Sequence, residues 1–366
     1  MSIKINYIDD FRQRERSLGL LESIKRISRR PSAIMEICGT HTHSISKYGI
    51  RDALPKNLHL ISGPGCPVCV TSAGDINRII EFSRREKGAI IATFGDMMRV
   101  PGSSSNLTEE RARGADVRVV YSPLGAIDIA RANPLKEVVF YAVGFETTAP
   151  TVAATIMKAK EDGVKNLSVL SLHKLTPPAM KALMDSGEVK IDGFICPGHV
   201  TAIIGAAAYE FLARDYRSPC VVAGFEPVDV LLGLYMLVKQ LEEGRADIEI
   251  EYKRIVTWEG NTKAQEAIAE VFEPAQASWR GIGVIPASGL RIRDRYAELD
   301  AEKKFYIASG VDAEPAGCAC GDVLKGIITP DECPLFGAVC TPSAPVGPCM
   351  VSSEGTCAAF YRYRAE

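Results

Sequence analysis

The sequence has 366 residues, of which 46% are hydrophobic and 24% charged, with a formal net charge of −2 at pH 7. This balance is typical of a soluble globular protein of two or three domains, and it argues against a broad nucleic-acid-binding or anionic-membrane-binding surface. No apolar run approaches the ~20 residues that span a bilayer, and the charged stretch 1–16 lacks the apolar core of a secretory signal. We therefore expect a cytoplasmic protein. In a reducing compartment its eleven cysteines favour metal, cluster or catalytic chemistry over structural disulfides.

The chain begins with a predicted helix and continues as alternating strands and helices. Residues 3–30 show helical spacing and stop before Pro31. Short apolar runs then follow one another, each ending in small residues and a helical pattern such as 74–88. This order is typical of a parallel sheet covered by helices. The expected strands are 33–38, 58–62, 89–94, 117–121, 137–143, 167–172, 191–196 and 220–223.

The turns after these strands are similar in the two halves of the region. SGPGCPVCV at 62–70 is similar to ICPGHVTAI at 195–203. Turns recruit the same residues everywhere, but duplication is the interpretation that we favour over that alternative. The fold class that we predict is α/β, with two similar parallel-sheet domains that face a common cleft. The predicted domains are 1–132, 133–242 and a cysteine-rich region, 243–366.

The last region differs from the rest in composition. Residues 248–261 could hold a strand, and 262–276 predict a helix that stops near Pro274. The following tail carries six cysteines among many Pro and Gly residues: Cys318, Cys320, Cys333, Cys340, Cys349 and Cys357. Such a segment buries little apolar surface, so we expect metal ligation to hold it together.

The tail cysteines predict an all-thiolate site, because the segment contains no histidine. Zinc sites usually consist of two short-spaced cysteine pairs, which are missing here. The wide, irregular spacing favours an iron–sulfur cluster, with structural zinc or spare buried cysteines as alternatives. A four-ligand cluster would leave two cysteines for a redox-active pair.

Two cysteine motifs near the N-terminus are further candidates. Cys66-Pro-Val-Cys69 follows a predicted strand at the start of a helix, which favours a redox dithiol over half of a metal site. Cys38 and His41, with His43, could bind a transition metal, or Cys38 could act as a nucleophile with His41 as its base.

Other candidates follow the predicted strands, where open parallel sheets bind ligands. They are Asp96, Glu146, His173, Cys196, His199 and Glu226. Cys220, at a strand start, is expected to be an inert buried thiol. The apolar loop residues Met97, Met98 and Val100 are expected to be exposed and to contact a partner.

Five segments resemble the HypD family of hydrogenase maturation factors, and together they span nearly the whole chain. They are CGTHTH at 38–43, GPGCPVC at 63–69, GFETTAP at 144–150, CPGHVTAIIG at 196–205 and the tail from Cys318 to Cys357. The resemblance implies two related α/β domains and a C-terminal iron–sulfur domain. It further implies a scaffold for assembly of the Fe(CN)2CO unit of nickel–iron hydrogenases. The expected partners are a HypC-type small chaperone and a HypE-type cyanide donor.

The resemblance also assigns roles to individual cysteines. The 4Fe–4S ligands would be Cys318, Cys333, Cys340 and Cys357. Cys320 and Cys349 would form a redox pair beside the cluster, similar to that of ferredoxin–thioredoxin reductase. Cys66 and Cys69 would be a second dithiol, and Cys38 would bind iron with His41 close by.

These roles lead to a hypothesis of electron flow. Electrons would pass from the cluster through Cys320/Cys349 to Cys66/Cys69, and keep an additional iron reduced while its diatomic ligands are added. That iron would be held by Cys38 and a thiolate of the chaperone. We thus expect an assembly scaffold with redox-active thiols rather than a classical turnover enzyme. The alternatives are a stand-alone iron–sulfur thiol–disulfide oxidoreductase and a zinc-binding structural adaptor.

Overall fold

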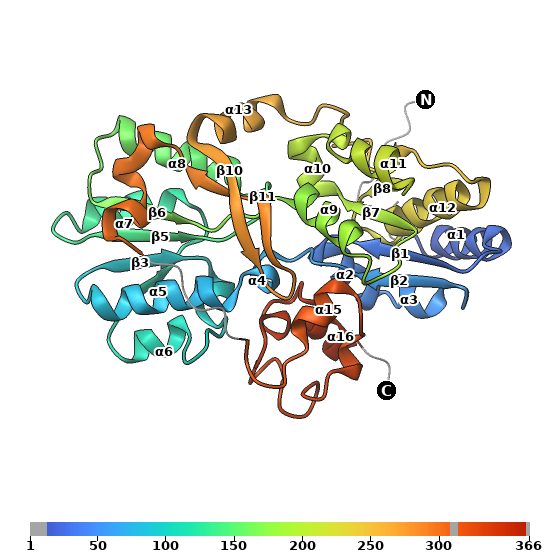
Figure 1. The fold of residues 1–366 in the computed structure, drawn as a ribbon, viewed down its shortest axis with the longest axis horizontal. Coiled ribbons are helices and arrows are strands. Elements are labelled where there is room, and N and C mark those ends of the chain that lie inside the picture. The colour runs from blue at the N-terminus through green and yellow to red at the C-terminus, as the bar shows by residue number, and fades with distance from the viewer. Residues whose placement is uncertain (1–12, 308–313, 364–366) are drawn as a thin grey trace.

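Two parallel β-sheets organise the chain in the computed structural model, which describes residues 13–307 and 314–363 (Figure 1). One sheet has the order β2-β1-β7-β8-β9 and the other the order β4-β3-β5-β6. The strands of the first sheet are β1 (Ser32–Glu36), β2 (Leu58–Ser62), β7 (Gly193–Pro197), β8 (Cys220–Ala223) and β9 (Ile248–Ile250). Those of the second are β3 (Ile90–Thr93), β4 (Asp116–Val119), β5 (Val138–Ala142) and β6 (Leu167–Ser171).

The predicted fold class is confirmed. Each of the eight expected strands forms, and every neighbouring pair in the two sheets runs parallel. The central strands β3, β5, β7 and β8 are buried at every position, which explains why they are continuous apolar runs in the sequence.

The distribution of the strands over the two sheets differs from the one that the predicted domain boundaries imply. Strands β3 and β4, expected in domain 1–132, lie in one sheet with β5 and β6, expected in domain 133–242, because β3 pairs with β5. The chain leaves the first sheet after β2 and returns to it only at β7, which pairs with β1. Two contiguous halves of four strands are therefore wrong. Periodicity along the sequence reports the order of strands but not their pairing partners.

Helices cover the faces of both sheets. The α-helices before the last strand of the sheets are α1 (Arg14–Ile27), α2 (Gly39–Lys47), α3 (Ile50–Ala53), α4 (Pro67–Val70), α5 (Ala73–Arg85), α6 (Leu107–Ala112), α7 (Leu124–Ala132), α8 (Ala149–Glu161), α9 (Thr176–Ser186), α10 (Gly198–Ile204), α11 (Glu210–Tyr216) and α12 (Pro227–Glu243). Two short 3-10 helices, η1 (Gly95–Met98) and η2 (Ala206–Tyr209), lie among them.

Two of these helices test the predictions. Helix α5 forms within one residue of its predicted start, because Ser72 caps it by accepting from Asp75 N. Helix α1 ends before Pro31 and packs on α12, and the part of its prediction at residues 3–12 lies outside the described residues.

A long antiparallel hairpin was not expected from the sequence. Strands β10 (Phe272–Trp279) and β11 (Gly283–Ile292) follow α13 (Thr262–Val271). This helix ends three residues before Pro274, where the sequence predicted its end. Phe272 already pairs with Ile292, so the strand begins where the helical pattern still continues. The hairpin crosses between the two sheets (Figure 1). It is followed by η3 (Asp294–Leu299) and α14 (Ala301–Phe305).

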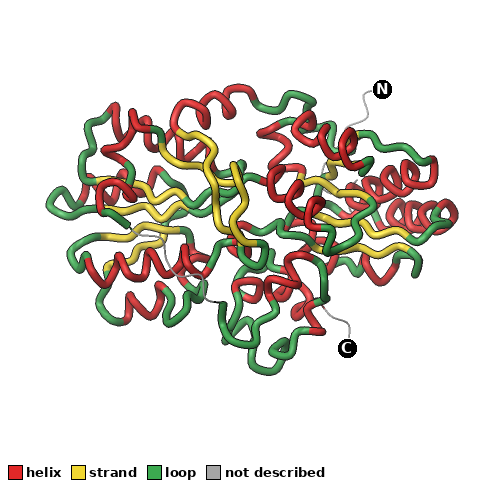
Figure 2. Tube along the Cα trace, in the orientation of Figure 1, coloured by secondary structure: helices red, strands yellow, loops and turns green. Residues whose placement is uncertain are grey.

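The cysteine-rich tail consists mostly of loops and turns (Figure 2). Its short helices are α15 (Cys320–Lys325), η4 (Pro330–Glu332), η5 (Pro348–Met350) and α16 (Thr356–Tyr363). Helix α16 packs on α2, and η5 packs on α4. The tail is thus seated on the two loops that carry the N-terminal cysteine motifs.

The space between the carboxyl ends of the two sheets is filled rather than open. One apolar cluster joins strands of the β4-β3-β5-β6 sheet to α4 and α10, which follow β2 and β7 of the other sheet, and to the hairpin and the tail. It includes Cys69, Phe145, Trp279 and Cys349. The loops expected to line a common cleft therefore contact a shared core.

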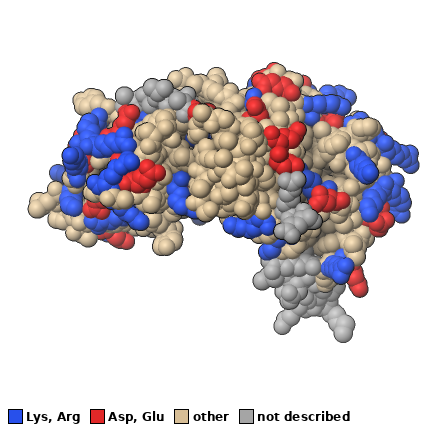
Figure 3. Space-filling model, turned by 90° about the horizontal axis from the view of Figure 1, so that it is seen from below, with Lys and Arg blue, Asp and Glu red and all other residues tan. Residues whose placement is uncertain are grey.

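Figure 3 shows the distribution of charged side chains on one face of the molecule. Lysine and arginine are interspersed with aspartate and glutamate there, and a wide area in the middle is uncharged. No helix in the described part of the chain has the length and hydropathy that a membrane span requires.

Met97, Met98 and Val100 do not form a partner surface. Their side chains are 1%, 6% and 0% exposed, and they pack in the cluster that holds Cys69. The prediction that they are exposed was wrong, because all three side chains pack into this apolar cluster and are covered by it.

Candidate functional site

Cys38 lies where the loops after β1 and β2 touch. It is the N-cap of α2, with extended backbone at φ −160° and ψ 123°. Gly39 N donates to Gly65 O at 2.8 Å. A Cβ at Gly65 would lie 2.1 Å from Cys38 N, so only glycine permits this approach. The close packing of the two loops, as well as turn formation, therefore explains the second glycine of the segment Gly63-Pro64-Gly65.

The Cys38 thiol is neutral when no metal is bound. Burial raises the pKa of this thiol to about 12, although the backbone N–H groups of His41 and Thr40 act against that rise. Cys38 N donates to Glu36 Oε2 at 3.0 Å, and burial raises the pKa of that carboxyl to about 7. A bound cation would replace the thiol proton, as metal–thiolate sites require.

His41 presents a bare ring nitrogen in a buried position. Its Nε2 lies 2.8 Å from Gly224 O, and because a carbonyl can only accept, Nε2 carries the proton. Its Nδ1 is then a lone pair, and it has no hydrogen-bond partner among the described residues. Burial lowers the pKa of His41 to about 4, so the ring is neutral. A neutral imidazole with a free lone pair is the form that binds a transition metal.

Two other histidines of this region, His43 and His199, have different surroundings from His41. His43 faces the tail, with Nδ1 3.3 Å from Ser353 O and Nε2 3.4 Å from Tyr363 OH. His199, on α10, is exposed and stacks on Phe225 at 4.0 Å, and Phe225 also contacts His41 at 4.8 Å. The ring of Phe225 thus separates His199 from His41.

Cys66 and Cys69 form a buried dithiol. Cys66 is the N-cap of α4, and Cys69 follows one turn later with no exposed surface. Burial raises the pKa of the Cys69 thiol, which also interacts with the thiols of Cys66 and Cys349. Cys69 Sγ lies 3.9 Å from Pro348 O of the tail.

The six tail cysteines line one small apolar cavity, together with Leu335, Phe336, Gly347 and Met350. A Cβ at Gly347 would lie 2.6 Å from Cys318 Sγ, so this glycine lets the backbone pass close to the thiols. In the described residues no group of three or more His, Cys, Asp or Glu side chains is arranged to hold a single metal ion. A lining of six cysteine thiols supplies the donor type that thiolate-bound metal sites use.

Cys349 links the two dithiols. Its Sγ is 2.7 Å from Cys320 Sγ, and its thiol also interacts with those of Cys357 and Cys69. The thiols therefore form a continuous series from the tail cavity through Cys320 and Cys349 to Cys69 and Cys66. The tertiary structure brings the tail cysteines beside a dithiol that lies some 250 residues earlier in the sequence.

The tail also contacts the Cys38 loop directly. Thr40 Oγ1 donates to Glu354 Oε1 at 2.7 Å. Negative charge on Glu354 contributes to the raised pKa of Cys38, after the larger effect of burial. Glu354 was not expected at this site, because sequence spacing gives no indication that this part of the tail meets α2. Phe225 belongs to the loop after β8, which was expected to lie at the same edge of the sheets as Cys38.

The remaining candidates lie apart from Cys38 and the tail cysteines or stabilise helices. Glu146 accepts from both N and Oγ1 of Thr176 at 2.7 Å and so caps α9, and Glu226 caps α12. Cys196 is fully buried on β7 and interacts with the Cys220 thiol on β8, which confirms that Cys220 is buried. Asp96 lies in the first turn of η1, and His173 follows β6, on the other sheet from Cys38.

Comparisons with known proteins identify the family of the chain. Residues 15–364 match the family described as HypD, Hydrogenase formation hypA family. The chain is 48% identical to hydrogenase maturation factor HypD2 of Bradyrhizobium diazoefficiens, over 98% of this chain and 97% of the relative. It is 46% identical to HypD of Azotobacter vinelandii, over 98% and 97%, and 43% identical to HypD of Escherichia coli, over 99% of each. The chain therefore belongs to the HypD family of hydrogenase maturation factors.

Proposed function

We propose that this chain is a scaffold and redox protein on which the Fe(CN)2CO unit of nickel–iron hydrogenases is assembled. The observation that carries the proposal is the series of adjacent thiols from the tail cavity to Cys66, which ends beside the loop of Cys38. Packing alone does not require such a series, because a buried cysteine packs equally well when no other thiol is next to it.

The iron under assembly is the cargo, and Cys38 with His41 is its proposed holding site. The bare Nδ1 of His41 and the desolvated thiol of Cys38 support this assignment. Sulfur and imidazole are ligands that suit iron, and a partly buried loop limits access of water. A HypC-type chaperone would supply a second thiolate, and a HypE-type protein the cyanide.

The resident cofactor that we propose is a 4Fe–4S cluster held by Cys318, Cys333, Cys340 and Cys357. The apolar, thiol-lined cavity fits such a group. When bound, it would supply electrons that return the Cys320–Cys349 pair to the dithiol state. The remaining chemistry belongs to the side chains of the chain itself.

Cys349 is placed to transfer reducing equivalents to Cys69. Its thiolate attacks Sγ of Cys69 in a Cys66–Cys69 disulfide, and the Cys66 thiolate leaves and takes up a proton. The Cys320 thiolate then attacks Sγ of Cys349, and Cys69 leaves as a thiolate that is protonated in turn. Two electrons and two protons thereby reach Cys66 and Cys69, and a Cys320–Cys349 disulfide remains.

The burial of these thiols favours a scaffold over a stand-alone oxidoreductase. Cys66, Cys69 and Cys349 are 4%, 0% and 1% exposed. A general reductant of protein disulfides needs an attacking thiol that its substrates can reach. Reduced thiols also suit the cytoplasm, where we place the protein.

Metal analysis with visible absorption on anaerobically purified protein tests the proposal. We expect about four irons per chain with the absorption of a cluster. Cys38→Ala should abolish loading of the additional iron and its diatomic ligands, read by their infrared bands, and leave the cluster signal intact. Cys357→Ala should lose the cluster, whereas Cys220→Ala, a buried thiol far from the series, serves as the matched control. One zinc per chain without colour would overturn the proposal, as would loss of the cluster in Cys38→Ala.

A further inference from the structure

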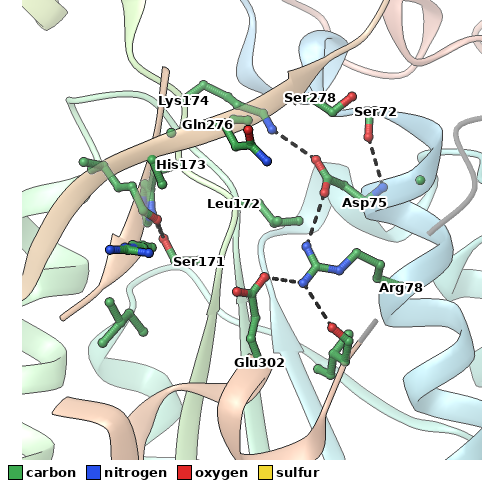
Figure 4. A pocket seen from close by; sticks show the side chains of 18 of the residues that line it. Ser72, Asp75, Arg78, Ser171, Leu172, His173, Lys174, Gln276, Ser278 and Glu302 are labelled. Atoms are coloured by element: carbon green, nitrogen blue, oxygen red, sulfur yellow. Dashed lines mark hydrogen bonds and ion pairs between the residues drawn. The ribbon is translucent and has the colours of Figure 1, made fainter. Parts of the chain in front are cut away.

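A polar cavity, distinct from the apolar cavity of the tail, lies at the carboxyl edge of the β4-β3-β5-β6 sheet. It has a volume of about 520 Å³ and is enclosed by the first turns of α5, the segment after β6, the hairpin β10–β11 and α14 (Figure 4). No cysteine lines it. Ser72 in its wall lies three residues after Cys69, so the cavity is next to the dithiol segment but separate from it. The carboxyl edge of a parallel sheet is where such folds bind ligands.

A chain of ion pairs runs along one wall of this cavity. Lys174 is 2% exposed, and its Nζ lies 3.0 Å from Asp75 Oδ2. Asp75 Oδ1 lies 3.5 Å from Arg78 NH1, and Arg78 also pairs with Glu302. In the described structure Asp75 is the ion-pair partner of Lys174, whose ammonium group has three donors. Lys174 therefore retains donors for an oxygen-bearing ligand.

His173 offers an acceptor that no described residue uses. Ser171 Oγ donates to Leu290 O at 2.8 Å, which occupies its only hydrogen. The Ser171 hydroxyl must then accept from Nδ1 of His173, 3.0 Å away, so the imidazole proton is on Nδ1. Nε2 is a lone pair without a partner on a side chain that is 1% exposed, and burial lowers the pKa of His173 to about 3. An unpaired buried acceptor carries a free-energy cost that a ligand donor would remove.

The charges of the lining define the class of ligand. Lys174, Arg78 and Arg291 are cationic, whereas Asp75, Asp300 and Glu302 are anionic, so three positive groups balance three negative ones. A ligand with a net charge would leave one charge uncompensated when it is desolvated. Phosphates and simple carboxylates therefore suit the cavity poorly. A zwitterionic ligand, which carries one positive and one negative charge, finds side chains of opposite charge for both in the lining of the cavity.

We propose that this cavity binds a small zwitterionic metabolite of the amino-acid class, whose carboxylate is held by Lys174 and whose ammonium group donates to Nε2 of His173. Gln276, on β10, is exposed at the mouth, and its amide projects toward the interior of the cavity (Figure 4). It would contact the side chain of the ligand.

Binding is tested on the purified full-length chain with each standard amino acid as a separate probe. Thermal unfolding identifies ligands, because binding to the folded chain raises its midpoint, and calorimetry gives their stoichiometry. Lactate and inorganic phosphate are the anionic probes of mismatched charge, and ethanolamine is the cationic one. We expect at least one amino acid to bind at one site per chain and the three mismatched probes to leave the midpoint unchanged. The measurement requires no iron, cluster or hydrogenase, so its outcome is independent of the proposed function.

Variants locate the site. Gln276→Trp should abolish binding by filling the mouth, and aromatic residues are compatible with an exposed strand position. His173→Phe should weaken binding by about tenfold or more, since it removes the acceptor for a charged donor. Lys239→Met removes an exposed lysine on α12 and is the matched control. If His173→Phe does not fold, Gln276→Trp alone decides. Binding of phosphate or lactate in place of amino acids, no binding of any amino acid, or unchanged binding in Gln276→Trp would each overturn the proposal.

Discussion

The thiols of Cys320 and Cys349 lie 2.7 Å apart, and Cys349 also interacts with the thiol of Cys69. Cys349 thus lies in the cysteine-rich tail and also contacts the segment after β2 that carries Cys69. In the proposed exchange, Cys349 is therefore the thiol that connects Cys320 to Cys69.

Cys349→Ser should uncouple the two dithiols. The variant keeps the four expected cluster ligands and the shape of the side chain, but it removes the sulfur that attacks Cys69. We expect reduction of a Cys66–Cys69 disulfide by the reduced tail to fall to background, measured by thiol alkylation and mass spectrometry after anaerobic reduction. Cys196→Ser, which changes a buried thiol outside the series, should retain the wild-type rate. A wild-type rate in Cys349→Ser would exclude the exchange.

Thr40→Val should weaken the attachment of the tail to the Cys38 loop. It removes the 2.7 Å hydrogen bond to Glu354, and such a bond to a charged group contributes about 1.5–3 kcal/mol. Urea unfolding of Thr40→Val, Glu354→Gln and the double variant gives the coupling free energy between the two residues. A coupling near zero would mean that the contact does not hold the tail.

Gly65→Ala should destabilise the loop that supports Cys38. Its Cβ would lie 2.1 Å from Cys38 N, and overpacking of this kind costs about 1–3 kcal/mol. Gly88→Ala is the matched control, because its Cβ would meet no atom within 4 Å. The free energies of unfolding of the two variants should differ by this amount. Equal values would show that the two loops separate easily.

Glu146 should make the folded chain less stable as pH rises toward neutrality. Burial raises the pKa of this carboxyl from 4.5 to about 7, although hydrogen bonds from Thr176 act against the rise. The folded chain therefore binds this proton more tightly than the unfolded chain does. The contribution of Glu146 to stability is complete below pH 4.5 and is lost as pH rises through about 7.

The variant Glu146→Gln isolates this effect. It keeps an oxygen that accepts from Thr176 and removes the titration. Between pH 5 and 7 the free energy of unfolding of the wild type should fall more steeply than that of the variant, by up to about 1.4 kcal/mol per pH unit. Glu210→Gln changes an exposed carboxyl and should follow the wild type. Parallel pH profiles for wild type and Glu146→Gln would contradict the prediction.

The strands and the cysteine motifs could be identified from the sequence because both depend on local patterns. A strand buried on both faces, such as β5, is apolar at every position, and the small residues that follow it mark a turn. The cysteine spacing of the tail indicated a thiolate site, and the segments CGTHTH and GPGCPVC indicated the family that the comparisons confirm.

Other features depended on contacts between distant segments. The pairing of β1 with β7 joins strands about 160 residues apart, and the hairpin β10–β11 begins within a helical pattern. The burial of Met97 and the meeting of Thr40 with Glu354 likewise follow from packing. No local pattern encodes which surfaces will be covered by a segment that arrives later in the chain.

The sequence by itself determined the residue types of the site and the local elements that carry them, since turn, strand and helix preferences act over a few residues. Only the tertiary structure decided that Cys69 and Cys349 are neighbours and that Nδ1 of His41 and Nε2 of His173 are left without partners. These relationships arise when the burial of apolar surface brings remote segments into one core. The partners of each polar atom are then set by which segments happen to face it, and not by its neighbours in the sequence.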